Sequence, residues 1–346
     1  MMTAAAQDAS VPVVKVDGLS VHSPAHEQPV VDRVHFELEA GRCLAVVGES
    51  GSGKSVMLRA LVGLEPQDWW ATGSVRINGN ALESMSKSAL RRLRRRDVAF
   101  VFQDASSALS PVRTVGANLR DSLRDTVGSR GEIRSESLRL LRQVGIPDPE
   151  RQLHSYPFEL SGGMRQRVMI AMSLAGRPNL LIADEPTSAL DVTIQAQIIQ
   201  LVRELQIQRQ LSMIWVSHDL RVVAGIADDV MVMYAGQVLE YGPMIDVLEN
   251  PKHPYTAGLI ACTPTITDPD RRLNSIPGQS RTFMTAPRGC VFWDRCELRS
   301  DPVCETVRPE LREARPGHWV ATSCELSSAG LDEPKRPLGL DRTDVR

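Results

Sequence analysis

The chain has 346 residues, of which 42% are hydrophobic and 24% charged, so it can bury one large core or two modest ones. Its formal net charge of -2 excludes a bulk basic field that would attract nucleic acid. No stretch reaches the ~18 consecutive apolar residues of a membrane-spanning helix, and residues 1–14 do not resemble a secretory signal. We therefore expect a cytosolic protein that reaches a membrane through partner proteins.

Short apolar strands and helical stretches alternate along the first 250 residues. Strands are expected over residues 13–21, 30–38, 44–47, 75–77, 98–102, 180–183, 213–216, 230–234 and 238–241. Helices are expected over residues 54–63, most of 104–176, and 192–208. This alternation predicts an α/β protein with a mostly parallel sheet that helices cover on both faces.

The character of the sequence changes after about Asn250. Proline becomes frequent, and four of the six cysteines fall in the last 60 residues. We therefore predict a domain over residues 12–250, with a helical part at about 104–176, followed by a small domain over 251–326. Residues 1–11 and 327–346 are expected to be disordered, because they are polar or small and lack periodicity.

The most specific motif is a glycine-rich loop that follows an apolar strand and opens a helix. Residues 48–55 read Gly-Glu-Ser-Gly-Ser-Gly-Lys-Ser and fit the pattern G-x-x-x-x-G-K-[ST]. The glycines allow successive backbone N–H groups to point at phosphate oxygens, while Lys54 should reach the β- and γ-phosphates and Ser55 should bind Mg²⁺. The predicted nucleotide contacts are Gly48, Ser50, Gly51, Gly53, Lys54 and Ser55.

Two adjacent carboxylates end the apolar strand at residues 180–183. Asp184 can hold Mg²⁺ through water, and Glu185 can act as the general base that polarises an attacking water. Adjacent acids at a strand end are also common in ordinary loops. The phosphate loop upstream favours the functional interpretation, because ligands bind at the carboxyl ends of parallel strands.

Residues 160–167, Leu-Ser-Gly-Gly-Met-Arg-Gln-Arg, resemble the signature sequence of ATP-binding-cassette (ABC) ATPases. Ser161, Gly162 and Gly163 can cap a helix N-terminus and so form a second anion site. The resemblance implies that this site faces the γ-phosphate held by the opposite subunit, so that two chains enclose two nucleotides. It also implies a P-loop NTPase fold with an antiparallel β subdomain and a helical subdomain beside the central sheet.

Other landmarks of the family follow in the expected order. Gln103 resembles the glutamine that senses Mg²⁺ and contacts the membrane subunit, and Asp191 ends a segment like the dimer-interface loop. His218 resembles the switch histidine that holds the γ-phosphate and the attacking water. The family usually places an aromatic residue on the adenine at the end of the first strand. Here the candidate is His22, which could equally be an exposed strand-end residue.

The C-terminal region resembles the extension of oligopeptide and dipeptide importer ATPases. The similarity rests on residues 252–256, Lys-His-Pro-Tyr-Thr, and on residues 276–278, Ile-Pro-Gly. Together with the cassette motifs, the resemblance covers about residues 12–326.

Four cysteines in this region form a candidate metal site: Cys290, Cys296, Cys304 and Cys324. Their spacing is wider than the paired C-x-x-C of zinc ribbons. Four thiolates suit zinc or a [4Fe–4S] cluster equally on charge and softness, and unliganded thiols are a third possibility. The resemblance to peptide importers favours the [4Fe–4S] cluster.

These resemblances imply the ATP-hydrolysing subunit of an importer of di- or oligopeptides, bound peripherally at the cytoplasmic face of a bacterial membrane. They imply ATP and Mg²⁺ as cofactors. The implied partners are a second ABC ATPase that is often a paralogue, two transmembrane permeases and an extracytoplasmic binding protein, with no nucleic acid.

A soluble ABC ATPase that is not coupled to transport is the alternative. Such relatives carry two cassettes or a long coiled coil, whereas this chain has one uninterrupted cassette. A module that does not hydrolyse ATP is disfavoured by the presence of Glu185 and His218. The cargo stays open, because relatives handle dipeptides, longer peptides, glutathione, nickel chelates and antimicrobial peptides.

Overall fold

The computed structural model describes residues 11–262, 276–279, 289–298 and 302–323. The segments predicted to be disordered, apart from residue 11, lie outside these ranges, as does Cys324. Within the described residues, no helix is long and apolar enough to cross a membrane.

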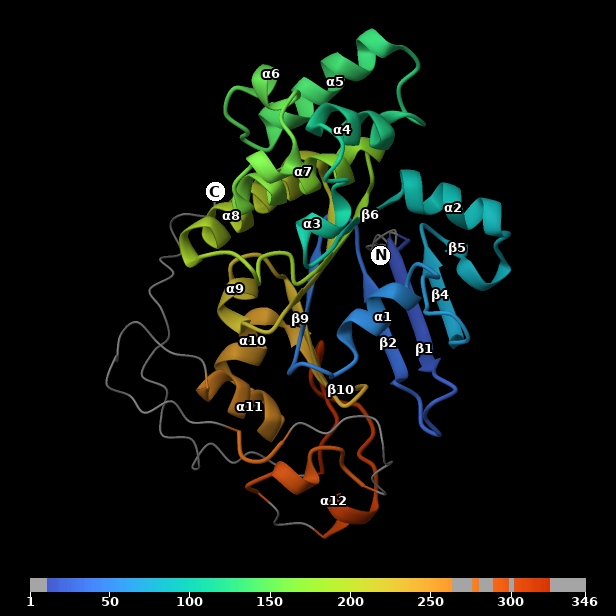
Figure 1. Ribbon diagram of the computed structural model, residues 1–346. Helices are drawn as coiled ribbons and strands as arrows, with labels where there is room; N and C mark the ends of the chain where they lie inside the picture. The colour runs from blue at the N-terminus through green and yellow to red at the C-terminus, as the bar shows by residue number, and fades with distance from the viewer. Residues whose placement is uncertain (1–10, 263–275, 280–288, 299–301, 324–346) are drawn as a thin grey trace, which may run out of the picture.

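A four-stranded antiparallel sheet forms one side of the molecule (Figure 1). Its order is β2 (Val31–Leu38), β1 (Val14–His22), β4 (Trp70–Ile77) and β5 (Asn80–Ala81). Strand β2 alternates buried and exposed residues, as expected for a sheet with one solvated face. The strand predicted at residues 75–77 corresponds to the end of β4, which begins earlier, at Trp70. This sheet confirms the antiparallel subdomain.

The central sheet has eight strands in the order β11-β12-β10-β9-β3-β8-β7-β6. Their bounds are β3 (Cys43–Val47), β6 (Val98–Val101), β7 (Leu180–Asp184), β8 (Ser212–Ser217), β9 (Asp229–Tyr234), β10 (Gln237–Pro243), β11 (Arg312–Arg315) and β12 (His318–Val320). Strands β6, β7, β8, β3 and β9 run parallel. Every residue of β3, β7 and β8 is buried. Helices cover one face of these strands, whereas α1 and the four-stranded sheet cover the other, so the expectation of helices on both faces is only partly right. The predicted α/β class is thus confirmed.

The helices divide into a group around the central sheet and a group above it in Figure 1. Around the sheet lie α1 (Lys54–Ala60), α2 (Lys87–Arg96), α8 (Val192–Arg209), α9 (Leu220–Ala224), α10 (Met244–Glu249) and α11 (Pro254–Ala261). Above it lie α3 (Ala105–Ala108), α4 (Val115–Leu123), α5 (Arg130–Gln143), α6 (Pro149–Gln152) and α7 (Gly162–Ser173). The short helix α12 (Val303–Thr306) belongs to the C-terminal region.

The upper helices pack through apolar positions spaced by one turn. Val115, Leu119 and Leu123 recur every fourth residue of α4 and are fully buried. Helix α5 begins with a capping box between Ser129 and Glu132, which satisfies two backbone donors that the helix leaves free. These helices occupy the range predicted for the helical subdomain.

The C-terminal region is joined to the central sheet by a buried carboxylate. Strand β12 pairs with β10, so the last strands extend the cassette sheet. Glu240 on β10 is fully buried and accepts hydrogen bonds from the backbone N–H groups of Lys252 (2.6 Å) and His253 (2.9 Å). It also bonds to the Nε2 atom of His318 on β12, at 2.7 Å. One side chain therefore connects β10, the start of α11 and the final strand.

Glu240→Ala is expected to lower the free energy of unfolding by about 3 kcal/mol or more, because a fully buried carboxylate loses its hydrogen bonds to three partners. Urea unfolding of the full chain measures this difference. The control is Glu204→Ala on the exposed face of α8, which should change the free energy by less than about 0.5 kcal/mol. Equal stabilities of the two variants would contradict the role assigned to Glu240.

Candidate nucleotide-binding and hydrolysis site

The glycine-rich loop turns sharply between β3 and α1. A Cβ atom on Gly48 would lie 2.1 Å from the carbonyl oxygen of Met233, so no larger residue fits there. Gly53 has φ +98°, a conformation that favours glycine. Lys54 is buried, and its Nζ donates to the carbonyl oxygens of Gly48 (2.7 Å) and Glu49 (2.8 Å). Burial lowers the pKa of Lys54, while nearby carboxylates oppose that shift.

The two predicted Mg²⁺ ligands at the loop and at β7 lie side by side. The Ser55 hydroxyl donates to Oδ1 of Asp184 at 2.9 Å. Burial raises the pKa of the Asp184 carboxyl, the Ser55 hydrogen bond lowers it, and the neighbouring charge of Glu185 raises it further. A cation beside Asp184 would offset the cost of burying this charge. Oxygen donors of this kind suit Mg²⁺, so these residues fit the ion.

The raised pKa of Asp184 predicts a pH-dependent cost in stability. The folded protein favours the protonated carboxyl, so the cost is fully present at neutral pH and declines as the pH falls from the folded-state pKa toward the lower unfolded-state pKa. Asp184→Asn is therefore expected to raise the Tm by a few degrees at neutral pH, with a difference that shrinks in acid. Thermal melts across pH test this. The exposed substitution Asp246→Asn should show no such trend, and a lower Tm for Asp184→Asn would refute it.

Glu185 follows β7 in a left-handed backbone conformation with φ +45°, which is uncommon for a residue other than glycine. Its N–H donates to the carbonyl oxygen of Val216 at the end of β8 (3.2 Å). Its carboxylate meets the Nδ1 atom of His218 at 3.1 Å. The sheet thus brings together two residues that are 33 positions apart in the sequence.

Gln103 lies two residues beyond the end of β6 and joins this group through Ser188. Its Nε2 donates to the Ser188 hydroxyl (3.2 Å), which in turn donates to the carbonyl oxygen of Glu185 (3.1 Å). The predicted Gln103, Glu185 and His218 are therefore connected within a single chain. Their chemical roles stay predictions.

The signature residues lie at the start of α7, as predicted. Ser161 is the N-cap and accepts a hydrogen bond from the backbone N–H of Met164 at 3.3 Å. A Cβ atom on Gly163 would lie 2.7 Å from Ile194, so glycine allows α7 to approach α8 closely. Gly162 is partly buried, and a Cβ there would meet Leu190 at 3.6 Å. Helix α7 packs on α3, α4 and α5, whereas α1 contacts β1 and β7.

Asp191 caps a helix in this structure. Its carboxylate accepts a hydrogen bond from the N–H of Ile194 at 2.9 Å and begins α8. The N-cap role is by itself a sufficient reason for an acidic residue at position 191. The predicted contact of Asp191 with nucleotide across a dimer stays a prediction.

His22 lies at the end of β1 opposite Trp70 of β4, and the two rings stack with centroids 5.2 Å apart and an interplanar angle of 7°. Trp70 is 51% exposed. The interpretation of His22 as a lone candidate missed this aromatic partner, which is remote in sequence. The adjacent tryptophans at 69 and 70 were the available signal.

Three of the four predicted cysteine ligands are described, and all three are buried: Cys290, Cys296 and Cys304. The N–H of Cys290 donates to the carbonyl oxygen of Cys304 at 2.7 Å. Burial raises the pKa of Cys290 to about 11, and the two neighbouring thiols contribute to the shift. Within the described part of the chain, no three His, Cys, Asp or Glu side chains are placed to hold a metal ion.

Comparison with known proteins agrees with this arrangement. The ABC transporter family model matches residues 31–188, and the model of the oligopeptide/dipeptide transporter C-terminal region matches residues 239–304. The dipeptide transport ATP-binding protein DppD of Haemophilus influenzae is 43% identical over 330 residues, which cover 94% of this chain and 98% of DppD. The oligopeptide transport ATP-binding protein OppD of Salmonella typhimurium is 42% identical, over 92% of this chain and 95% of OppD.

Among solved structures, the ATP-binding cassette MJ0796, a dimer in a post-hydrolysis state bound to ADP and Pi, superposes with a TM-score of 0.59. The two sequences are 28% identical, and the aligned region covers 67% of this chain and 98% of MJ0796. The fold and the motifs thus define an ABC-type P-loop ATPase. The chain belongs to the family of ATP-binding subunits of ABC transporters that carry the oligopeptide/dipeptide C-terminal region.

Proposed function

We propose that this chain hydrolyses ATP to drive the import of di- or oligopeptides across a bacterial cytoplasmic membrane. The observation that carries the proposal is the placement of the Glu185–His218 pair beside the Ser55–Asp184 pair at the carboxyl edge of the central sheet. The similarity to DppD and OppD over most of the chain supports peptide as the cargo class.

In the proposed reaction, the phosphate loop and Lys54 hold the phosphates of ATP. Ser55, Asp184 and Gln103 would hold Mg²⁺, which neutralises charge on the β- and γ-phosphates. Glu185 accepts a proton from the attacking water, and His218, fixed by its contact with Glu185, orients that water and the γ-phosphate. His22 and Trp70 provide an aromatic surface for adenine.

The signature residues Ser161, Gly162 and Gly163 complete the site of a second cassette, either another copy or a paralogue, and Asp191 lies at the same seam. Supporting this arrangement, α7 packs mainly on α3, α4 and α5, whereas α1 packs on β1 and β7. The MJ0796 relative is likewise dimeric. Hydrolysis removes the phosphate that bridges the two halves, and the dimer reopens.

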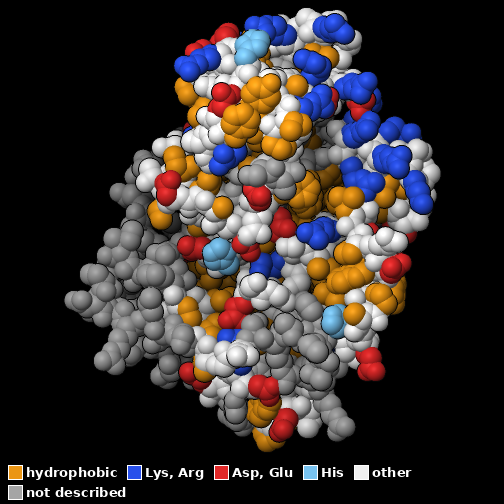
Figure 2. All heavy atoms as spheres, in the orientation of Figure 1, with side chains coloured by type: hydrophobic (Ala, Val, Ile, Leu, Met, Phe, Trp, Pro, Cys, Tyr) orange, Lys and Arg blue, Asp and Glu red, His pale blue; other side chains and the backbone are white. Residues whose placement is uncertain are grey.

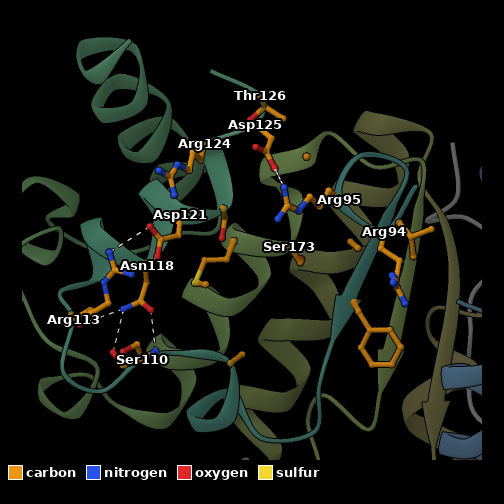
Figure 3. A pocket seen from close by; sticks show the side chains of 17 residues that line it. Arg94, Arg95, Ser110, Arg113, Asn118, Asp121, Arg124, Asp125, Thr126 and Ser173 are labelled. Carbon is orange, nitrogen blue, oxygen red and sulfur yellow. Dashed lines mark hydrogen bonds and ion pairs between the residues drawn. The ribbon is translucent and has the colours of Figure 1, made fainter. Parts of the chain in front are cut away.

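We propose that the permeases contact a groove of about 890 Å³ between the central sheet and the upper helices (Figure 3). It is lined by α2, β6, α4 and the segment that follows Gln103. Ion pairs line its walls, including Arg95 with Asp125 and Arg113 with Asp121. A contact here would place the membrane subunits next to the segment that follows Gln103, at the cytoplasmic face of the membrane.

The arginine run of α2 borders the same groove. Figure 2 shows Lys and Arg side chains gathered over α2, at the upper right of the molecule. Arg94 donates to the carbonyl oxygens of Val62 and Gly63, and Arg95 pairs with Asp125. These contacts engage part of the arginine run within the chain itself.

The four cysteines are proposed to hold a metal centre, with a [4Fe–4S] cluster favoured over zinc. The proposal rests on the chemistry of the residue type, since soft thiolates are the usual ligands of such centres. The side chains that the structure describes are not themselves placed to hold a metal ion. Iron and zinc analysis of anaerobically purified protein tests it. About four iron atoms per chain are expected, and a colourless protein with one zinc would exclude the cluster.

The test of the function is reconstitution of the chain with its permeases and binding protein in proteoliposomes. Di- or oligopeptide added with the binding protein should stimulate ATP hydrolysis and be taken up. A soluble ATPase unconnected to transport would hydrolyse ATP at a rate that neither permeases nor peptide change.

A further inference from the structure

Glu49, the second residue of the phosphate loop, is held from outside the cassette at two points. Its backbone N–H donates to the phenolic oxygen of Tyr255, a fully buried residue of α11, at 2.9 Å. Its carboxylate forms a two-pronged ion pair with Arg295, at 2.5 and 3.0 Å. Both partners lie in the C-terminal region, more than 200 residues from the loop.

Arg295 is held in one orientation by its own surroundings. Its side chain is 5% exposed, its Nε donates to the carbonyl oxygen of Pro277 at 2.8 Å, and its guanidinium lies 5.7 Å from the ring centre of Tyr234. Gly278 lies against the arginine stem, since a Cβ there would be in van der Waals contact with Cγ of Arg295 at 3.4 Å. A planar guanidinium fixed in this way presents a rigid fork to a carboxylate.

The two C-terminal sequence motifs therefore converge on one residue of the loop. The segment 252–256 supplies Tyr255, and the segment 276–278 forms the carbonyl and glycine wall around Arg295. The ATPase mechanism above uses neither motif. Their shared target is Glu49, whose carbonyl oxygen also accepts from Lys54.

The charge of Glu49 explains why the loop would need such a partner. A carboxylate beside the phosphates of ATP repels them, and this repulsion is strong where water is scarce. The Glu49 charge already influences Lys54, which the loop uses for phosphate. Pairing with Arg295 cancels that charge and fixes the side chain away from the path of the phosphates.

We propose that Arg295 is a positioning residue for ATP binding, which acts through Glu49 to hold and neutralise the phosphate loop. The C-terminal region is thus a structural part of the nucleotide site. The proposal rests on the phosphate-loop assignment made above.

The test is the Kd for a fluorescent ATP analogue, measured on the full-length chain. Arg295→Met should weaken binding about tenfold, because it frees the Glu49 carboxylate beside the phosphates. The kcat at saturating ATP should stay within about twofold, since Arg295 does not touch the reacting atoms. Arg295→Lys keeps the charge but loses the fork, so it should weaken binding by only about threefold.

The decisive variant is the double substitution Glu49→Gln with Arg295→Met. It removes the unpaired charge together with its partner, so the Kd should return to within about threefold of the wild-type value. Arg308→Met is the matched control, because Arg308 also links the C-terminal region to the cassette, through Asp32 on β2, without touching the loop. It should leave the Kd unchanged.

The possible results distinguish a failure of the role proposed for Arg295 from a failure of the phosphate-loop assignment. A wild-type Kd for Arg295→Met, or a double variant as weak as the single one, would overturn the proposal. Lys54→Ala tests the assignment of residues 48–55 as the phosphate-binding loop. If this substitution does not weaken ATP binding, the loop is not the phosphate site. If Lys54→Ala abolishes binding while Arg295→Met has no effect, the positioning role alone is wrong.

Discussion

Glu185→Gln is expected to reduce ATP hydrolysis at least about 100-fold while ATP still binds, because the amide cannot accept the proton of the attacking water. The substitution keeps the size of the side chain and one oxygen near His218, so the fold should survive. Turnover is measured by phosphate release, and ATP binding by the fluorescent analogue. Tight binding without turnover is the result that identifies a base.

The control for this substitution is Glu204→Gln, which changes an exposed carboxylate on α8 in the same way. It should leave turnover unchanged. If Glu185→Gln hydrolyses ATP at the wild-type rate, Glu185 is not the base. Loss of both binding and turnover would instead indicate damage to the fold, which a thermal melt would reveal.

Ser161→Arg is expected to abolish hydrolysis by the chain purified alone, because in the proposed dimer the bulky cation would block the surface on which a second cassette closes over the γ-phosphate. ATP should still bind to the phosphate loop of the same chain. Lys54→Ala should lose ATP binding as well as hydrolysis, because Lys54 belongs to the phosphate loop itself. Both effects on hydrolysis should exceed about 100-fold, since each removes a contact made to the transferred phosphate.

Mixing the two inactive variants tests the shared seam directly. If two identical chains form two composite sites, half of the randomly formed dimers pair one variant with the other. Each such dimer has one intact site and one doubly damaged site, so about a quarter of the wild-type activity should return. Absence of recovery in a mixture shown to exchange subunits would mean that each site is built within one chain.

The local parts of the nucleotide site could be predicted from the sequence. Residues 48–55 require glycine at defined positions because the loop takes left-handed backbone conformations, as Gly53 with φ +98° demonstrates. Buried parallel strands require continuous apolar runs, which is why β3, β7 and β8 were found within one or two residues. Motifs of this kind depend on neighbours in the chain.

Other parts could not be predicted, because they depend on pairs of residues that are distant in sequence. Trp70 covers His22 since β4 pairs with β1, and the register of two strands 48 residues apart leaves no local signal. The central sheet also continues into the C-terminal region through β12 and the buried Glu240, across a boundary that composition alone suggests is a domain break. The amino-acid composition of a segment indicates whether it is exposed or rich in turns, but it does not indicate which strands pair.

The sequence by itself determined the α/β class, the phosphate loop, the acidic pair at the end of β7 and the family to which the chain belongs. These follow from short-range constraints: backbone conformation, burial period and the fixed order of motifs. Tertiary structure alone decided that Glu185 contacts His218, and that Glu49 pairs with Arg295 and hydrogen-bonds to Tyr255. Such contacts depend on how the sheet and the C-terminal region close on one another, and closure is set by packing over the whole chain.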